Sequence, residues 1–354
     1  MKGVFLLSLL FAINTGLLYA QAFDAVRVEE IVVRGNFRTK NEIILREMPL
    51  SAGNEISIYA LPELLEESRE LLLNTGLFNQ VSVAREDTEP GRVRLLVEVQ
   101  ELWYIFPIPV LELADRNFNI WWVEHQRSLE RLTYGLDFTH RNFSGYNDKF
   151  SLGFKLGYAQ KFELSYRRPF VNRSQNLGVN ARVQFLRNRE LNYETIENKQ
   201  AFFREESENF IYERLRLDLT FTYRNKWRSY HDFALFFNRD KVEDIVIRQL
   251  NPDFFPTEKP LYRYFSLSYT YNLDHRDIRP YPLKGFLLKA ELKKDGFGIF
   301  KDRDALTLRP RYEQYVALHP KWNLANTLSG KYSFVRKPQP YNDNRAIGFL
   351  GNSL

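Results

Sequence analysis

The sequence contains no cysteine among its 354 residues and only 2 methionines. Without cysteine there are no disulfide bonds, thiolate metal sites, cysteine nucleophiles or lipid-modified N-terminal cysteine. No internal apolar run approaches the roughly 20 residues that a helix needs to cross a bilayer, so a bundle of transmembrane helices is excluded. Basic and acidic residues number 50 and 44, an excess too small to indicate nucleic-acid binding.

Aromatic residues, in contrast, are abundant, with 29 Phe and 20 Tyr. A hydrophobic content of 44% can bury a core, which excludes a disordered chain. The excess of Phe and Tyr over Met is typical of strands rather than helices. The composition therefore favours a folded protein rich in β-structure.

Residues 1–20 read MKGVFLLSLLFAINTGLLYA, with one cation at Lys2, an apolar stretch over 4–11 and a small residue at Ala20. This pattern predicts a signal peptide. A membrane anchor is the alternative, but residues 14–16 interrupt an already short run. The mature chain is therefore expected to be exported.

Residues 22–101 carry signals for a small β-α-α-β-β module. A strand over 26–36 ends at Gly35, and the capping-box spacing from Thr39 to Glu42 predicts a helix that starts at Thr39. A second helix should begin near Pro62 and end at Gly76. Two strands follow, over 81–85 and 92–99.

The string NTGLFNQVSV (74–83) resembles the helix–turn–strand passage of POTRA domains, the periplasmic modules of polypeptide-transport proteins. The resemblance implies structural roles for Gly35, Gly76 and Phe78, which would form turns, cap a helix and fill the core. It also implies a binding role for an exposed strand, because an open sheet edge can accept a strand from a client chain. The residues of that strand are Val81, Ser82, Val83, Ala84 and Arg85.

From residue 102 onward, apolar and polar residues alternate with a period of two in segments of about 10 residues or more. Such segments fit tilted strands of a membrane barrel, and a soluble sandwich is the alternative. Aromatic residues at segment ends favour the barrel. So does the alternation of short turns (142–147, 172–175, 225–227, 319–321) with longer loops (187–209, 243–261, 296–303).

About eleven strands can be counted between residues 103 and 335, whereas bacterial single-chain barrels usually have an even number. We therefore expect the sequence to be truncated. The expected fold is an α+β module over 22–101 followed by a partial antiparallel transmembrane β-barrel over 102–354.

Three strings of the second half resemble the BamA/TamA-like outer-membrane assembly factors: LWYIFPIPVLELADRNFNIWW (102–122), YRRPFVNRSQNLG (166–178) and LDHRDIRPYPLKGF (273–286). The last is similar to a turn motif of that family, whose residues here are Asp274, Arg276, Asp277, Pro282 and Gly285. Read from chemistry alone, these residues make a periplasmic turn that pairs its own charges.

The resemblance implies a barrel of sixteen strands in the bacterial outer membrane, with the POTRA domain in the periplasm. In the family an Arg-Gly-aromatic triplet follows strand eleven. Here the segment AIGFLGNSL (346–354) ends the sequence before any such triplet.

The function implied is the insertion of unfolded outer-membrane proteins, without cofactor or metal. The partners would be those proteins and outer-membrane lipid, and the resemblance allows periplasmic or lipoprotein accessory subunits; no nucleic acid is expected. A passive pore or surface antigen, and a secretion pore for one dedicated partner, are the alternatives. Pro107 and Pro109 would weaken the pairing of strand one at the barrel seam. Five scattered histidines and the absence of a Gly-x-Ser-x-Gly or phosphate-binding motif indicate no enzyme.

Overall fold

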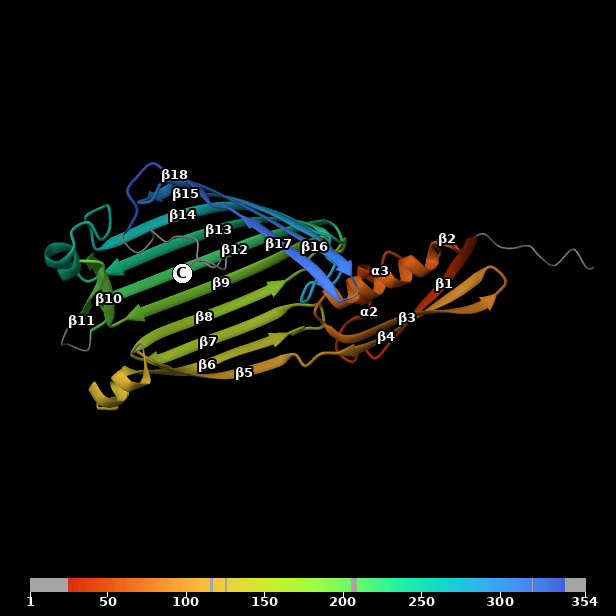
Figure 1. Ribbon diagram of the computed structural model, residues 1–354, viewed down its shortest axis with the longest axis horizontal. Coiled ribbons are helices and arrows are strands. Elements are labelled where there is room, and N and C mark those ends of the chain that lie inside the picture. Colours follow the sequence, from red (N-terminus) through yellow and green to blue (C-terminus); the bar gives the residue numbers. More distant parts are fainter. Residues whose placement is uncertain (1–24, 115–116, 125, 205–208, 320, 341–354) are drawn as a thin grey trace, which may run out of the picture. The chain divides into compact units, whose positions relative to one another are not determined.

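The computed structural model describes residues 25–114, 117–124, 126–204, 209–319 and 321–340 (Figure 1). The chain divides between Leu102 and Trp103 into two compact units. The predicted signal peptide and the segment 346–354 lie outside the described residues. No helix of the described part is long and apolar enough to cross a membrane.

The first unit is a four-stranded sheet with two helices. In the sheet order β2-β1-β4-β3, the central pair β1–β4 is parallel and the outer pairs are antiparallel. The predicted β-α-α-β-β order is confirmed, and the short β2 is an addition that the sequence did not reveal. The elements are β1 (Ala25–Arg34), α2 (Asn41–Glu47), β2 (Glu55–Ser57), α3 (Leu61–Asn74), β3 (Phe78–Glu89) and β4 (Arg92–Glu101).

The core of this unit forms because β4 alternates buried and exposed side chains while both helices bury one apolar side. Val93, Leu95 and Val97 are almost fully buried, whereas Glu98 on the other face is exposed. The helices contribute the fully buried side chains Ile43, Ile44, Leu61 and Leu72. Apolar side chains recur about every 2 residues in the strand and about every 3.6 residues in the helices, and both sets pack into one apolar layer.

The start of α2 differs from the predicted capping box. The helix begins at Asn41, and its N-terminal flanking residue Lys40 makes no side-chain cap. Instead, the carboxylate of Glu101, at the end of β4, accepts hydrogen bonds from the backbone N–H of Arg38 (3.0 Å) and of Thr39 (2.7 Å), and from the Thr39 hydroxyl. A distant carboxylate therefore stabilises this turn in place of the local Thr39–Glu42 pair.

We expect Glu101→Gln to lower the free energy of unfolding of this unit by about 2 kcal/mol, because hydrogen bonds to an ionised acceptor contribute more than neutral ones. Amide hydrogen exchange of the buried residues of β4 measures this change. Glu98→Gln is the matched control, since Glu98 is an exposed residue of the same strand, and should stay within about 0.5 kcal/mol. Equal protection in both variants would contradict the capping role.

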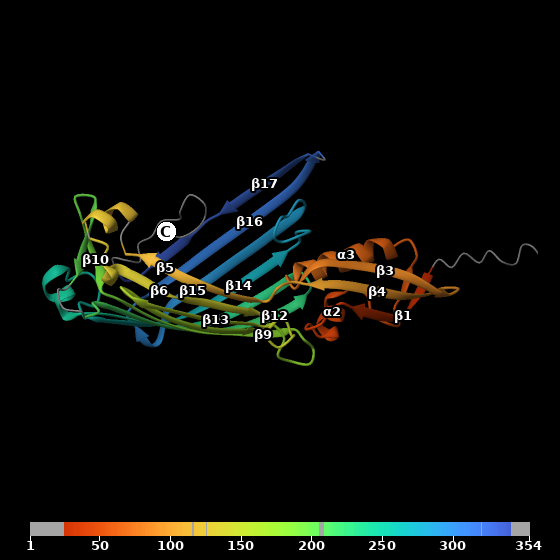
Figure 2. The same cartoon turned by 90° about the horizontal axis from the view of Figure 1, so that it is seen from below.

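The second unit is one large antiparallel sheet whose strands follow each other in sequence order, apart from a separate hairpin, β10 (Glu190–Ile196) and β11 (Lys199–Arg204). β5 and β17 lie at its two ends, and Figure 2 shows that the sheet is curved. Its strands are β5 (Ile105–Leu113), β6 (Leu132–Arg141), β7 (Lys149–Gly157), β8 (Ala159–Arg168), β9 (Leu177–Asn188), β12 (Tyr212–Lys226), β13 (Ser229–Val242), β14 (Leu261–Asp274), β15 (Gly285–Lys301), β16 (Ala305–His319), β17 (Trp322–Ser329) and β18 (Tyr332–Val335).

Along most of β9, β12, β13 and β14, the registers place apolar residues opposite apolar residues on one face of the sheet. Phe221 pairs with Phe233, which pairs in turn with Tyr269, and all three side chains are exposed. On the opposite face, Arg182 forms an ion pair with Asp218. The predicted alternation is thus confirmed as two faces, one apolar and exposed, the other polar and internally paired, which is the pattern of a barrel wall in lipid.

The two ends of the sheet carry different connections. At the end where β5 begins, the near end, the connections are 142–148, 169–176, 227–228 and 275–284. At the opposite, far end the longer ones are 114–131, 189–211 and 243–260. The loop predicted over 296–303 is wrong, because β15 continues to Lys301 and only residues 302–304 connect it to β16.

The two longest predicted loops of the far end are folded rather than irregular. The first contains the hairpin β10–β11, and the second contains one helical turn, η3 (Val246–Leu250). Together they bury an apolar cluster in which Val246 and Phe254 are fully buried and Tyr262 nearly so. Two further helical turns, η1 (Ile120–Glu124) and the shorter η2 (Leu129–Arg131), lie in the connection between β5 and β6.

Candidate functional site

The strand that carries Val81–Arg85, β3, lies at the edge of the first sheet. Among the described residues it pairs only with β4. Arg27 donates to the carbonyl of Gly91 (2.9 Å), and Leu102 donates to that of Leu77 (2.9 Å). These bonds show that the backbone N–H and C=O groups of the odd-numbered residues of β4 face β1. Those of the even-numbered residues face β3. The backbone groups of Val81, Val83 and Arg85 therefore point to the open edge.

The side chains of Val81–Arg85 alternate between the two faces of the sheet. Val81 and Val83 are half-buried on the helix-covered face, while Ser82, Ala84 and Arg85 are exposed. The strand is thus held in place by its apolar side chains while its backbone edge stays accessible.

Gly35, Gly76 and Phe78 have structural roles in this unit. The Phe78 side chain is buried at the start of β3. Gly76 follows α3 with a φ of +70°. Gly35 directly follows β1 and has a φ of +85°, and a Cβ there would lie 2.0 Å from the carbonyl oxygen of Val99 on β4. None of the three presents a chemical group of its own.

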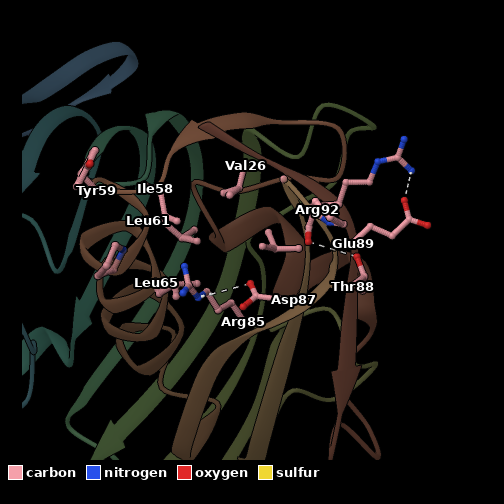
Figure 3. Close-up of a pocket in the computed structure, with 14 residues that line it drawn as sticks. Val26, Ile58, Tyr59, Leu61, Leu65, Arg85, Asp87, Thr88, Glu89 and Arg92 are labelled. Carbon is pink, nitrogen blue, oxygen red and sulfur yellow. Dashed lines mark hydrogen bonds and ion pairs between the residues drawn. The ribbon is translucent and has the colours of Figure 1, made fainter. Parts of the chain in front are cut away.

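A pocket of about 1040 Å³ opens beside the β3–β4 hairpin (Figure 3). Its apolar side is formed by Ile58, just before α3, and by Leu61 and Leu65 in the first turns of α3. Its polar side is formed by Arg85 and Asp87, whose charged groups lie 3.9 Å apart. The pocket adjoins the open strand, so an added strand would find apolar surface next to backbone donors.

Hydrogen bonds to a carboxylate on β1 stabilise the tip of the β3–β4 hairpin. Glu29 on β1 accepts hydrogen bonds from the Thr88 hydroxyl (2.9 Å) and from Arg92 (3.0 Å). These two hydrogen bonds hold the pKa of Glu29 below its usual range. The carboxylate therefore stays ionised under mildly acidic conditions, and the end of β3 keeps its position there.

The predicted turn motif closes a charged cluster at the near end of the second sheet. Asp274, almost fully buried at the end of β14, accepts two hydrogen bonds of 2.9 Å from Arg276, and Arg279 lies 3.0 Å from the same carboxylate. Arg276 also donates to Glu313 on β16 (3.3 Å). The hydrogen bonds to Asp274 hold the pKa of Arg276 above its usual range.

The remaining residues of the motif shape the turn. The side chain of Asp277 accepts a hydrogen bond from the backbone N–H of Leu283 (3.1 Å), and Pro282 precedes Leu283 in the turn. Gly285 has a φ of +98°, and a Cβ there would lie 2.0 Å from the carbonyl oxygen of His275. The charged side chains of Asp274 and Arg276 pair with each other, as charge pairing within a turn requires.

Pro107 and Pro109 lie in β5, at the edge of the sheet, opposite Phe138 and Leu136 of β6. The β5–β6 register runs without a shift from Ile105 to Leu113. That these prolines weaken the pairing of this strand at the barrel seam stays a prediction. Six strands, β6 to β13, separate β5 from the Asp274 turn, so the two predicted sets do not form one site.

Within the described part of the chain, no group of three or more His, Asp or Glu side chains is arranged to hold a metal ion. The two units instead offer the exposed backbone groups of the β3 edge and the exposed apolar face of the large sheet.

Comparison with protein families assigns the two units. The model of the surface antigen variable number repeat, a POTRA module, matches residues 26–102, and that of the Omp85 superfamily domain matches residues 142–348. The chain belongs to the Omp85 superfamily. The predicted BamA/TamA-like resemblance is thereby confirmed at the level of the family. A search of curated proteins gave no match.

One of three solved structures that align with this Omp85 protein has a TM-score above 0.5. BamA from Haemophilus ducreyi lacking POTRA domains 1–3 aligns with a TM-score of 0.52 and 17% identity, covering 92% of this chain and 59% of that one. CdiB from Acinetobacter baumannii aligns with a TM-score of 0.46 and 12% identity, covering 89% and 54%, and CdiB from Escherichia coli with 0.32 and 10%, covering 88% and 70%. The chain thus spans less than two thirds of the BamA structure, and the likeness to that structure establishes the fold.

Two features of this Omp85 protein had no sequence signal. Glu101 stabilises residues 38 and 39 across 62 positions, and no local pattern marks such a contact. At the far end, the hydroxyl of Tyr158 hydrogen-bonds Glu190, and the Arg131 and Arg204 guanidinium groups lie over its ring at 5.3 and 5.5 Å.

Proposed function

We propose that this Omp85 protein receives unfolded outer-membrane barrel proteins at the open edge of β3 and inserts them into the bacterial outer membrane. The proposal divides the chain into a signal peptide (1–20), a periplasmic POTRA module (22–101) and an outer-membrane barrel segment (102–354). The observation that carries it is the accessible row of backbone groups at Val81, Val83 and Arg85, in a chain of this family.

Strand addition suits clients that differ in sequence. A client strand that pairs with β3 forms backbone hydrogen bonds, each worth about 1 kcal/mol net, and none depends on its side chains. The adjoining pocket can take an apolar side chain of the client. Recognition would therefore select extended, partly apolar segments, which is what unfolded barrel strands are.

Insertion needs no chemical energy source in this proposal. Apolar side chains gain free energy on entering lipid, but unpaired backbone groups cannot stay there. A client strand has to keep its hydrogen bonds while it moves, and the edge strand β5 of the barrel segment offers backbone groups for this step. Lipid would contact the exposed apolar face of the sheet, and accessory subunits would bind the POTRA module.

The test is Val83→Pro in the full-length protein, because proline removes the N–H that points to the open edge. Cross-linking of an unfolded barrel client to a photoreactive group at position 82 should fall about five- to tenfold, the effect of losing one hydrogen bond. Val83→Ala is the matched control, since it shortens the same side chain and keeps the N–H.

Equal loss in Val83→Pro and Val83→Ala would mean that packing, not strand addition, binds the client. No cross-linking in the unmodified protein, together with unchanged levels of other outer-membrane barrels after depletion, would overturn the proposed function.

A further inference from the structure

Three basic residues lie directly opposite one another on β6, β7 and β8. Arg141 pairs with Lys149, and Lys149 pairs in turn with Arg167. Side chains at directly opposed positions of an antiparallel ladder point to the same face, with their Cβ atoms about 5 Å apart. The three cations therefore form one row across the near end of the large sheet, the cation row.

The cation row lies on the polar face of the sheet, and all three of its side chains are exposed. Arg167 follows Ser165 by two residues, and Ser165 pairs with Arg182, which lies on the polar face. Beside the cation row, on the same face, runs a second row of three hydroxyl groups. Its members are Thr139, Ser151 and Ser165.

The strands on either side of the cation row place no acidic group beside it. On β9, Asn180 pairs with Arg167. On the other side, the Arg141 guanidinium lies over the Phe106 ring of β5, 5.2 Å from its centroid. Within the part of the chain that the structure describes, none of the three cations forms an ion pair.

The acidic groups nearest to the cation row along the chain have other partners. Asp148 accepts hydrogen bonds from the backbone N–H of Ser144 (2.8 Å) and from the Tyr166 hydroxyl (2.9 Å). Glu163 lies 2.7 Å from Lys161. The charge of the cation row is therefore not balanced by its neighbours.

Other cations of the polar face are balanced by a carboxylate on the next strand. Arg214 lies 2.5 Å from Asp240, and Arg309 lies 3.3 Å from Glu291. The cation row departs from this pattern, and like charges directly opposite each other destabilise a ladder. A bound anion would remove this repulsion, so the cation row has the electrostatics of an anion-binding surface.

The size of the cation row favours one kind of anion. Neighbouring strands lie about 4.8 Å apart, so the row spans roughly 10 Å. A single phosphate ion could contact all three cations only if they converged, which would increase their mutual repulsion. Several carboxylates along an acidic peptide can instead contact one cation each, and arginine binds a carboxylate with two parallel hydrogen bonds. The hydroxyl row can donate to the same carboxylates.

We propose that the cation row binds an acidic peptide segment of another protein at the near end of the polar face. Because β6, β7 and β8 are paired with a strand on both sides, the segment binds through side chains and not by strand addition. It differs in this from the partly apolar client that pairs with the edge of β3. The proposal does not depend on the insertion role.

The first test measures the binding of fluorescein-labelled hexaglutamate to the full-length protein in detergent, by fluorescence anisotropy. Its affinity should fall at least about tenfold in R141Q/K149Q/R167Q, since charge-assisted hydrogen bonds are lost. R34Q/K40Q/K199Q is the matched control, because it removes the same charge from three exposed residues outside the row. This control should bind the peptide as tightly as the unmodified protein.

Three results of this test would overturn the proposal. One is an absence of peptide binding to the unmodified protein. Another is equal weakening in both triple variants, which would mean that net charge alone attracts the peptide. The third is tighter binding of inorganic pyrophosphate than of hexaglutamate, which would make the cation row a site for small anions.

The second test measures the temperature at which the folded barrel unfolds in detergent. R141Q/K149Q/R167Q should unfold roughly 2–4 °C above the unmodified protein, because the repulsion between opposed cations is removed. Hexaglutamate should raise the unfolding temperature of the unmodified protein but not that of the variant. A variant less stable than the unmodified protein would mean that the three cations stabilise the sheet, against the proposal. Neither test uses a barrel client, so both stay decisive if the insertion role fails.

Discussion

Replacement of Gly35 by alanine is expected to unfold the POTRA module. Its φ of +85° is strained for any residue with a Cβ, and the added carbon would lie 2.0 Å from the carbonyl oxygen of Val99. Since that oxygen belongs to the central strand β4, it cannot move without disturbing the sheet. We expect a loss of about 4 kcal/mol in the free energy of unfolding of the module, combining backbone strain and overpacking.

Gly76→Ala is the control for this prediction. Gly76 also has a positive φ, of +70°, but no atom lies within 4 Å of the position that its Cβ would take. The variant should therefore lose only about 1 kcal/mol, the cost of the left-handed conformation. Amide exchange of the buried residues of β1 and β4 measures both variants in the full-length protein. Similar losses at the two positions would show that the close approach of Gly35 to Val99 is not decisive.

The second large effect is expected for Asp274→Asn at the near end of the barrel segment. The Asp274 side chain is almost fully buried between Arg276 and Arg279, and its neutralisation leaves these cations without their nearest counter-charge. Removal of one partner of a buried ion pair is strongly destabilising, so we expect a loss of about 3 kcal/mol. The temperature at which the folded barrel unfolds in detergent reports this change.

Two further variants separate charge pairing from general damage. Asp253→Asn alters an exposed aspartate in the 243–260 connection and should change the stability by less than about 0.5 kcal/mol. The double variant D274N/R276Q should lose less than the sum of its single variants, because the two side chains act as a unit. Additive losses would mean that the Asp274–Arg276 contact contributes little.

The alternation of side chains was sufficient to predict most strands of the second unit. β9, β12 and β14 lie within a few residues of the predicted segments 176–187, 210–224 and 262–274. The reason is that a wall between lipid and a polar interior imposes a period of two on every strand, so the pattern is repeated and local. In the first unit, likewise, the spacing of apolar residues was enough to predict both helices.

Features that depend on residues far apart in sequence were not predictable. The capping box at Thr39 was a reasonable local pattern, but the Glu101 carboxylate satisfies the same donors from another strand. The folded connections of the far end were expected to be irregular, because their apolar residues, such as Ile211 and Phe254, have no periodic spacing and become a core only together.

By itself the sequence determined the two-part architecture, the two faces of the large sheet and the resemblance to an outer-membrane assembly family, because each of these is written in local periods and motifs. Only the tertiary structure decided which strands form the edges of the described sheets and which way their backbone groups point. That direction depends on register, and register is set by pairing between strands: it turned the backbone groups of Pro107 and Pro109 away from β6 and toward the edge of the sheet.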